Sequence, residues 1–521
     1  MLRRIALLLF LVLCTLALAG RRAGQDTQGL ELSTPKREAE ALFRQVATLV
    51  ETRSADEPPA GTLLSDSLDG MLHGLDPHSN YYSPEVFKDF MEDQEGRFSG
   101  LGMLVAKPSA TSPLLVVTPI PDTPASRAGI RAGDVILEVD GEPTDKMTSR
   151  EAVRKLKGPE GTPVTIKLGR GDAKPESMTL KRAPIPKHTV PYGFLLDDGV
   201  GYVKVNTFGQ TTVEELRSKL VELLAQGMTS LILDLRDNPG GSLQAAVGVA
   251  SLFLQQGQEV VSVRGRKAAQ AAIRYRATGD GTFTKTPLVV MINLGSASAS
   301  EIVAGALQDH DRAQVVGERS WGKGLVQTLT PLGNDGAVAI TTARYYTPSG
   351  RLIQRDYSRS YDAYYFPDQQ PEDVVQKEAK PVAAHTDRGK TVYGGGGIAP
   401  DVEVKADKIP PLALQYERAR TFLEFMAKEA EKGPLDGTWV GSDAMVAQFK
   451  AYVAASSKTP VDEKSWKESE AYIRCALSRE AMTMLEGQGA GYRAMIPMDN
   501  QLLKAEEVLK KAPASVQDKA A

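Results

Sequence analysis

Cysteine is almost absent from this sequence, which has only two in 521 residues. Cys14 lies in an apolar run at the N-terminus, and Cys475 lies in a segment with helical periodicity. Two cysteines placed in this way offer no disulfide framework. The 42% of hydrophobic residues is enough for a sizeable core, and the length suggests three or four domains.

A large net charge is also lacking, because the formal charge is -3 with the histidines neutral. The composition therefore gives no electrostatic reason to expect binding to nucleic acid or to an anionic membrane surface. We expect no nucleic-acid partner, no metal and no other cofactor.

Long apolar runs are confined to the N-terminus. Arg3 and Arg4 precede an apolar run from Ile5 to Ala19, and Ala17-Leu18-Ala19 offers a small-residue cleavage site. This order is typical of a secretory signal, and an uncleaved anchor is the alternative, although the run is shorter than the ~20 residues that span a bilayer. We interpret residues 1–24 as a signal peptide or N-terminal anchor. We expect an exported protein, periplasmic or in the cell envelope, that is soluble or associated with the membrane through this segment.

Periodicity divides the rest of the chain into four regions. Apolar residues at helical spacing indicate an N-terminal helical region at 25–96, and short strands between turns indicate a β-rich unit at 97–183. Alternating strands and helices indicate an α/β domain at 184–405. Helical spacing returns in 406–521. The fold class is therefore multidomain α/β.

Six elements of the α/β domain follow from its apolar pattern, and a Tyr-rich stretch at 355–397 is expected to be a loop, either an ordered surface excursion or a mobile lid. The expected strands are Tyr202–Val205, Leu231–Leu235 and Leu288–Ile292, and the expected helices are Val213–Gln226, Leu243–Leu254 and Ser300–Gln308.

Amphipathic helices are expected at both ends of the chain. Near the N-terminus, Leu42, Phe43, Val46, Leu49 and Val50 form one apolar face at helical spacing. The C-terminal faces suit dimerisation, packing on the core or recruitment of a partner. The expected C-terminal helices are Leu412–Lys432, which stops at Gly433-Pro434, and patterns near Asp443–Val453, Asp462–Glu486 and Met498–Lys511.

The most informative block is Gly295-Ser296-Ala297-Ser298-Ala299-Ser300-Glu301, which follows the Leu288–Ile292 strand. A serine nucleophile here lies at the sheet edge, close to the free amides and the positive dipole end of a helix. The N–H of Ala299 can supply one donor of an oxyanion hole. An equally good local interpretation is helix capping, with Ser298 and Glu301 as a capping box or Ser296 as a simple N-cap.

A base for this serine is not supplied by histidine in any convincing context. His310 lies in what looks like a solvated helix end, and His78 lies in a turn; the others are His73, His188 and His385. Lys323, between Gly322 and Gly324, is a better candidate, because burial lowers the pKa of a lysine and frees its lone pair. The alternative is an ordinary surface lysine in a hairpin.

A third block, Asp234-Leu235-Arg236-Asp237-Asn238-Pro239-Gly240-Gly241, follows the Leu231–Leu235 strand. Two glycines at the carboxyl end of a strand are where sites form in α/β sheets, and the amides of Gly240 or Gly241 could complete an oxyanion hole. A tight turn and a phosphate-binding loop are the alternatives, but no Walker-type lysine follows.

Together and in this order, these three blocks resemble the C-terminal processing, or tail-specific, protease family. Leu75-Asp76-Pro77-His78-Ser79 and the β-rich unit also fit, and the resemblance spans about Leu72 to Val404. It implies a sheet-and-helix serine protease core at 184–405 with an inserted PDZ domain at 97–183.

The resemblance also implies a serine–lysine dyad. It places the nucleophile at Ser298, the base at Lys323, and a polar residue that orients the lysine at Gln327. The implied activity is that of a serine endopeptidase that cuts proteins near their C-terminal tails. A silent PDZ scaffold and a hydrolase or acyltransferase of small molecules are the rivals; intact Ser298, Lys323 and Gln327 argue against the first and the PDZ unit against the second.

The loop around Gly100, Leu101, Gly102 and Met103 resembles the carboxylate-binding loop of a PDZ domain. A substrate strand added beside Leu101–Val105 would be held by main-chain hydrogen bonds, and Leu101, Val153 and Leu156 could line its apolar pocket or simply pack the domain. Thr148 and Glu151 fit a capping box that opens the helix through Leu156. The implied partners are protein substrates with exposed C-terminal tails, an adaptor protein, and a second copy bound through the C-terminal helices.

Overall fold

The computed structural model describes residues 36–56, 59–265, 272–279, 281–358, 364–366, 382–433, 435–456 and 462–511. The expected signal or anchor lies outside these ranges. Among the residues within them, no helix has both the length and the apolar character to cross a membrane. The chain divides into two compact units, Met1–Leu68 and Asp69–Ala521.

The described part of the first unit consists of helix α2 (Lys36–Arg53) and the beginning of α3 (Ala60–His73). The apolar residues of α2 share one face of the helix as expected, but this face is exposed to solvent. Leu42, Phe43, Val46 and Leu49 are 41–61% exposed.

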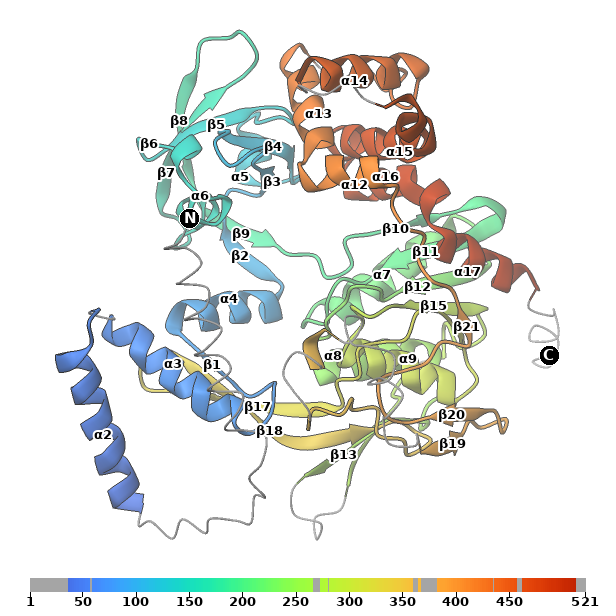
Figure 1. Ribbon diagram of the computed structural model, residues 1–521. Coiled ribbons are helices and arrows are strands. Elements are labelled where there is room, and N and C mark those ends of the chain that lie inside the picture. The colour runs from blue at the N-terminus through green and yellow to red at the C-terminus, as the bar shows by residue number, and fades with distance from the viewer. Residues whose placement is uncertain are drawn as a thin grey trace. The chain divides into compact units, whose positions relative to one another are not determined.

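The core of the second unit is a six-stranded sheet in the order β10-β11-β12-β15-β16-β21 (Figure 1). All neighbours are parallel except β10 and β11. The predicted strand at Leu288–Ile292 has the bounds of β15. The strands are β10 (Tyr192–Leu195), β11 (Val200–Lys204), β12 (Ser230–Asp234), β15 (Leu288–Ile292), β16 (Gln314–Gly317) and β21 (Val402–Glu403).

Helices cover both faces of this sheet because its strands are apolar on both sides. Alternate side chains of a strand point to opposite faces, so Leu231 and Leu233 pack with one set of helices and Ile232 with another. The first face carries α7 (Thr212–Ala225), α8 (Leu243–Phe253) and α9 (Ala299–Asp309), and the second carries α17 (Asn500–Lys511).

A second sheet, in the order β1-β18-β13-β14 with β17 paired to β18, lies in the same unit. It was not anticipated from the sequence. Because β1 pairs with β18, the chain just before β1 is brought to the strands that follow the Lys323 loop. The strands are β1 (Asn80–Tyr82), β13 (Glu259–Gly265), β14 (Ile273–Arg276), β17 (Leu325–Pro331) and β18 (Ala337–Tyr346).

The β-rich unit forms a sheet in the order β3-β4-β5-β7-β8 with helix α6 (Ser149–Leu156) beside it. The predicted capping box is confirmed: Thr148 Oγ1 accepts the Glu151 N–H, and the Glu151 carboxylate accepts the Thr148 N–H. The strands are β3 (Met103–Ala106), β4 (Leu114–Pro119), β5 (Val135–Val139), β7 (Pro163–Gly169) and β8 (Glu176–Lys181); β2 (Arg97–Gly100) pairs with β9 (Ala183–Pro186) where the chain enters and leaves.

The C-terminal region is helical as expected, with one correction. The single helix predicted over Leu412–Lys432 is wrong, because Arg420 takes a left-handed conformation with φ of 55° and divides it. Part of the 355–397 stretch expected to be loop forms a hairpin, β19 (Ala383–His385) with β20 (Thr391–Tyr393). The helices are α12 (Pro411–Arg418), α13 (Thr421–Glu431), α14 (Asp443–Ser456), α15 (Glu463–Glu486), α16 (Gln488–Met495) and α17.

Candidate active site

Ser298 lies at the turn between strand β15 and helix α9, at the N-cap position of the helix. Its φ of 53° and ψ of -113° are rare for a residue with a side chain, and such a conformation costs about 1–3 kcal/mol. A strained serine in a strand–turn–helix junction is typical of a nucleophile held above a sheet edge. The predicted capping pair of Ser298 and Glu301 is present, because the Glu301 carboxylate accepts the Ser298 backbone N–H.

The two neighbouring serines are buried and have structural partners. Ser296 Oγ accepts the Asn293 N–H at 3.0 Å and donates to the Leu235 carbonyl at 2.8 Å. Ser300 Oγ donates to the Asn238 carbonyl at 2.8 Å. The interpretation of Ser296 as the helix N-cap is therefore wrong, since Ser298 holds that position.

Glu301 connects the Ser298 turn to the Lys323 loop. Its Oε2 accepts the backbone N–H groups of both Ser298 and Lys323, each at 2.8 Å. Its Oε1 accepts the Gly322 N–H at 2.7 Å and the Ser320 hydroxyl at 2.5 Å. The backbone nitrogens of Ser298 and Lys323 therefore lie at most twice 2.8 Å apart, although 25 positions separate the two residues in the sequence.

Tyr345 makes the corresponding connection on the carbonyl side. Its hydroxyl lies 3.1 Å from the Ser298 carbonyl oxygen and also contacts the Lys323 carbonyl oxygen. Burial raises the pKa of Tyr345 well above its usual value, so the hydroxyl keeps its proton as a donor. Two buried side chains thus fix the backbone of Ser298 and Lys323 together.

The environment of Lys323 makes its ammonium group easier to deprotonate. Burial lowers its pKa, and this effect outweighs the charges of Glu301 and Asp76, which act to raise it. This is the direction that a lysine base requires, and it disfavours the interpretation of Lys323 as an ordinary surface lysine.

Gln327, the polar residue predicted to orient Lys323, is linked to the surroundings of Lys323 through Thr341. Its Nε2 donates to Thr341 Oγ1 at 3.2 Å, and Thr341 Oγ1 donates to Asp76 Oδ1 at 3.0 Å. Asp76 is buried and also accepts the N–H groups of His78 and Ser79. The Gln327 amide is therefore connected to a carboxylate whose charge acts on Lys323.

His78 lies in its expected turn, whereas His310 differs from its expected setting. His78 is also close to the site: its Nε2 is 2.5 Å from the Tyr364 hydroxyl, and burial together with the Lys323 charge lowers its pKa to about 4. His310 is not solvated, because its side chain is only 9% exposed and contacts Asp387 and the Glu259 carbonyl. His310 follows the last turn of α9, at the end opposite to Ser298.

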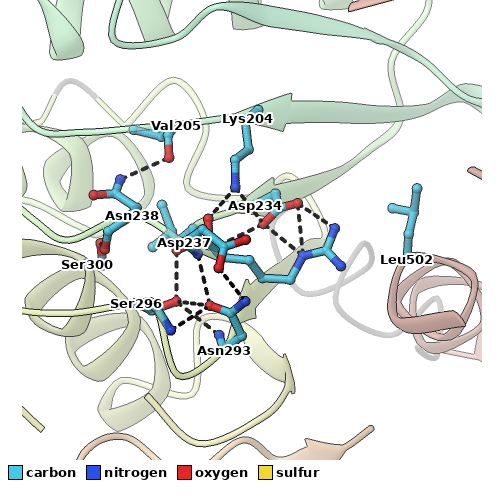
Figure 2. A network of polar contacts seen from close by, with 12 residues as sticks. Lys204, Val205, Asp234, Asp237, Asn238, Asn293, Ser296, Ser300 and Leu502 are labelled. Atoms are coloured by element: carbon cyan, nitrogen blue, oxygen red, sulfur yellow. Dashed lines mark hydrogen bonds and ion pairs between the residues drawn. The ribbon is translucent and has the colours of Figure 1, made fainter. Parts of the chain in front are cut away.

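Asn238 fastens the glycine turn to the Ser298 loop. Its Nδ2 donates to the Val205 carbonyl at 2.9 Å (Figure 2). Its own backbone carbonyl accepts the Ala297 N–H at 3.0 Å and the Ser300 hydroxyl. Gly240 must be glycine here, because a Cβ on it would lie 2.7 Å from Ser298 Cβ, and its φ is 103°. The turn and the serine are therefore in direct contact.

The candidate oxyanion donors fall into two groups. The Gly240 N–H donates to Asn238 Oδ1 at 2.9 Å and is already used. Within the described ranges, the N–H groups of Gly241 and Ala299 have no protein acceptor.

Arg236 links this turn to the C-terminal helices. Its guanidinium donates to Asp234 Oδ2 at 2.7 Å and to both carboxylate oxygens of Asp499, at 2.9 and 2.7 Å. It also donates to the Tyr492 hydroxyl at 2.8 Å. Burial opposes the ionisation of Asp234, but the charges of Arg236 and Lys204 outweigh it and hold the pKa of Asp234 well below its usual value.

The residues expected to bind a peptide tail lie together in the β-rich unit. Gly100 to Met103 lead into β3, which pairs with β4 on one side only in the described part of the chain. Leu101 and Leu156 are buried in the apolar core of this unit, and Val153 on α6 is half-buried. No group of His, Cys, Asp and Glu among the described residues is arranged to hold a metal ion.

Comparison with known proteins gives two family matches and several relatives. A sequence model of peptidase family S41 matches residues 199–358, and one of the PDZ domain matches residues 115–170. A carboxy-terminal-processing protease of Bartonella bacilliformis is 42% identical over 319 residues, which are 60% of this chain and 72% of that protein. A carboxyl-terminal-processing protease of Synechocystis is 34% identical over 364 residues, 67% of this chain and 81% of that protein.

Proposed function

Since the chain belongs to peptidase family S41 and is a carboxy-terminal processing protease with a PDZ domain, we propose that Ser298 is its nucleophile and Lys323 its general base. The observation that carries this proposal is the shared anchoring of the two residues. Glu301 accepts both of their N–H groups, and Tyr345 contacts both of their carbonyl oxygens.

The chemistry follows from the state of Lys323. Its neutral amine accepts the Ser298 hydroxyl proton as Oγ attacks the scissile carbonyl. The lysine then donates that proton to the leaving amine, which leaves an acyl-enzyme. A water that gives its proton to Lys323 then attacks the ester, and Lys323 returns that proton to Ser298 Oγ as the second product leaves. No step requires a histidine.

Gly241 and Ala299 are our candidates for the oxyanion donors. Their N–H groups have no protein acceptor among the described residues, whereas that of Gly240 is held by Asn238. Ala299 is also the first residue of α9, where the helix dipole favours negative charge. Gly240 contributes by leaving room beside Ser298.

Gln327 is proposed as a positioning residue that acts through Thr341 and Asp76. The hydrogen bonds from Gln327 to Thr341 and from Thr341 to Asp76 hold the carboxylate whose charge acts on Lys323.

Recognition of substrates is assigned to the PDZ domain. An extended tail would add a strand to the free edge of β3, with its carboxylate at the amides of the Gly100–Met103 loop. Its last side chain would enter the apolar space near Leu101, Val153 and Leu156. The natural substrates would therefore be proteins with an exposed, apolar-ended C-terminal tail.

A substrate with a chemically defined tail tests this function. A folded protein that carries an unstructured, apolar-ended tail should be cleaved, and the same protein with a C-terminal amide should be cleaved several-fold more slowly, as measured by mass spectrometry of the products. Equal rates for the carboxylate and the amide would contradict recognition by the PDZ domain, while leaving the peptidase assignment intact.

Export is a further part of the proposal. Arg3, Arg4 and the apolar run from Ile5 to Ala19 support a periplasmic or cell-envelope location, where the enzyme would work alone, with an adaptor or as a homo-oligomer. Cell fractionation followed by N-terminal sequencing would decide between a cleaved signal and an anchor. Recovery of the whole protein in the cytoplasm would contradict export.

A further inference from the structure

The C-terminal helices pack directly on the sheet of the PDZ domain. Leu115 and Val117 of β4 are buried in one apolar cluster with α13, α14 and α15. Along β3 the side chains alternate: Met103 and Val105 pack on the PDZ core, whereas Leu104 packs on the C-terminal cluster. The strand that would receive a substrate tail is thus bordered by residues from the far end of the chain.

A cavity of about 390 Å³ lies where β3 ends. Its PDZ side is formed by Val105 and Ala106 of β3 and by Ser149, the first residue of α6. Its other side is formed by α12, α13 and α15 and the turn between the first two, including Leu423. Because β3 and α6 are the two walls of the proposed groove, this cavity continues the groove beyond its far end.

Two arginines line this cavity, and they differ in their ion-pair partners. Arg479 is paired with Glu417 at 3.0 Å and with Glu480 at 2.7 Å. Arg420 donates to the Lys107 carbonyl at 2.9 Å, and no carboxylate within the described ranges forms an ion pair with it. Its side chain is exposed, at the left-handed turn between α12 and α13. One cation at the end of the groove is therefore available to a ligand.

The direction of a bound tail brings it to this cation. A tail with its carboxylate at Gly100–Met103 runs along the four residues of β3 and reaches the cavity at the last two, Val105 and Ala106. Arg420 lies just beyond them, on the Lys107 carbonyl. Each residue of a strand advances the chain by about 3.3 Å, so roughly the fifth or sixth residue from the end of the tail would enter.

We propose that the C-terminal helices form the outer part of the tail-binding groove, and that Arg420 selects tails with an acidic residue about five or six positions before the C-terminus. The proposal rests on tail binding by the PDZ domain and adds a second determinant to it. The PDZ loop reads the end of the tail, and the C-terminal helices read the segment before it.

Direct binding to full-length protein carrying Ser298→Ala, which cannot cleave the probe, tests the inference. The probes are fluorescent twelve-residue peptides with the same four apolar C-terminal residues and with Asp, Asn or Lys at the fifth and sixth positions from the end. For a partly exposed ion pair, the Asp peptide should bind roughly 1.4- to fivefold more tightly than the Asn peptide, and the Lys peptide more weakly still. The difference should shrink as salt is added.

Variants at two arginines that lie two positions apart separate this contact from a general charge effect. Arg420→Gln should abolish the preference for Asp, and Arg420→Lys should retain part of it. Arg418→Gln is the matched control, because Arg418 is exposed on the same turn of chain but does not line the cavity. It should leave the preference unchanged.

Two results would overturn the inference for different reasons. An unchanged preference for Asp in Arg420→Gln, or an equal loss in Arg418→Gln, would remove Arg420 from recognition while tail binding itself stands. Equal binding of peptides with a C-terminal amide, or no binding of any peptide, would instead refute tail recognition by the PDZ domain, and the inference with it.

Discussion

The backbone N–H groups of Ser298 and Lys323 donate to the same oxygen atom, Oε2 of Glu301, each at 2.8 Å. Residues from two different loops are thus held in a fixed relation by a carboxylate that is completely buried. The arrangement places the serine and the lysine together without requiring a contact between their side chains in the resting molecule. Several consequences of this arrangement can be measured.

Replacing Glu301 by Gln should damage both loops. A carboxylate accepts all four donors, whereas an amide has one accepting oxygen and an N–H₂ group that would face other donors. Each buried donor left without an acceptor costs about 1–3 kcal/mol, and a displaced dyad should lower kcat/KM by about 100-fold. Glu214→Gln changes an exposed residue in the first turn of α7; it is the control and should have little effect. Similar activity for the two variants would argue against the anchoring of Ser298 and Lys323 by Glu301.

Activity should rise with pH through the titration of Lys323. The protonated lysine cannot accept a proton, so the enzyme is inactive below the pKa of Lys323 and active above it. Because burial lowers this pKa, the rising limb of kcat/KM should lie below the usual lysine value of 10.5. The pKa of His78 is lowered to about 4, so His78 does not account for a rise in activity at higher pH. The rising limb assigned to Lys323 should therefore remain in His78→Gln. A limb at or above the usual lysine value would contradict a buried base.

Gly240→Ala should be more harmful than the same change at Gly227. Both residues have similar positive φ, 103° and 98°, so both substitutions carry the left-handed penalty of about 1–2 kcal/mol. Only at Gly240 would the new Cβ meet Ser298 Cβ, at 2.7 Å, whereas Gly227 has open space. We therefore expect loss of activity in Gly240→Ala and near-normal activity in Gly227→Ala. Urea unfolding and kcat/KM should be measured on both, and equal activities would contradict the contact.

Asp499 lies in the C-terminal region, and Asp499→Ala should nevertheless impair catalysis. It removes two acceptors from the Arg236 guanidinium, which precedes the turn that carries Gly240 and Gly241. The loss should lower the free energy of unfolding by about 1–3 kcal/mol and should also lower kcat. Asp499→Asn, which keeps one acceptor, should fall between this variant and the wild type. Lys510→Ala removes only an exposed ion pair between α17 and Asp198 and serves as the control. The same kcat in both alanine variants would contradict a role for Asp499 in positioning the turn through Arg236.

The sequence was most informative where a local pattern determines structure. The run of apolar residues at Leu288–Ile292 identifies a strand buried on both faces, and its bounds were predicted correctly. The small residues that follow it locate the turn that carries Ser298. The Thr148–Glu151 capping box likewise depends on four consecutive residues, and it is present.

Long-range partners were beyond the reach of local patterns. Spacing identifies Glu301 as the N3 residue of a helix, but its other three donors come from residues 320–323, which a capping pattern does not include. Asp76 and His78 read as a turn, and only the pairing of β1 with β18 brings them toward Lys323. The break at Arg420 was missed because the apolar spacing continues across it.

The most direct test of the account compares the wild type with Ser298→Ala and Lys323→Ala in cleavage of a protein with an unstructured, apolar-ended tail. We predict that both variants fold normally, as judged by circular dichroism and urea unfolding, and that each loses activity completely. Retention of cleavage by Ser298→Ala at the wild-type rate would contradict the assignment of the nucleophile. Retention of cleavage by Lys323→Ala would contradict the assignment of the base.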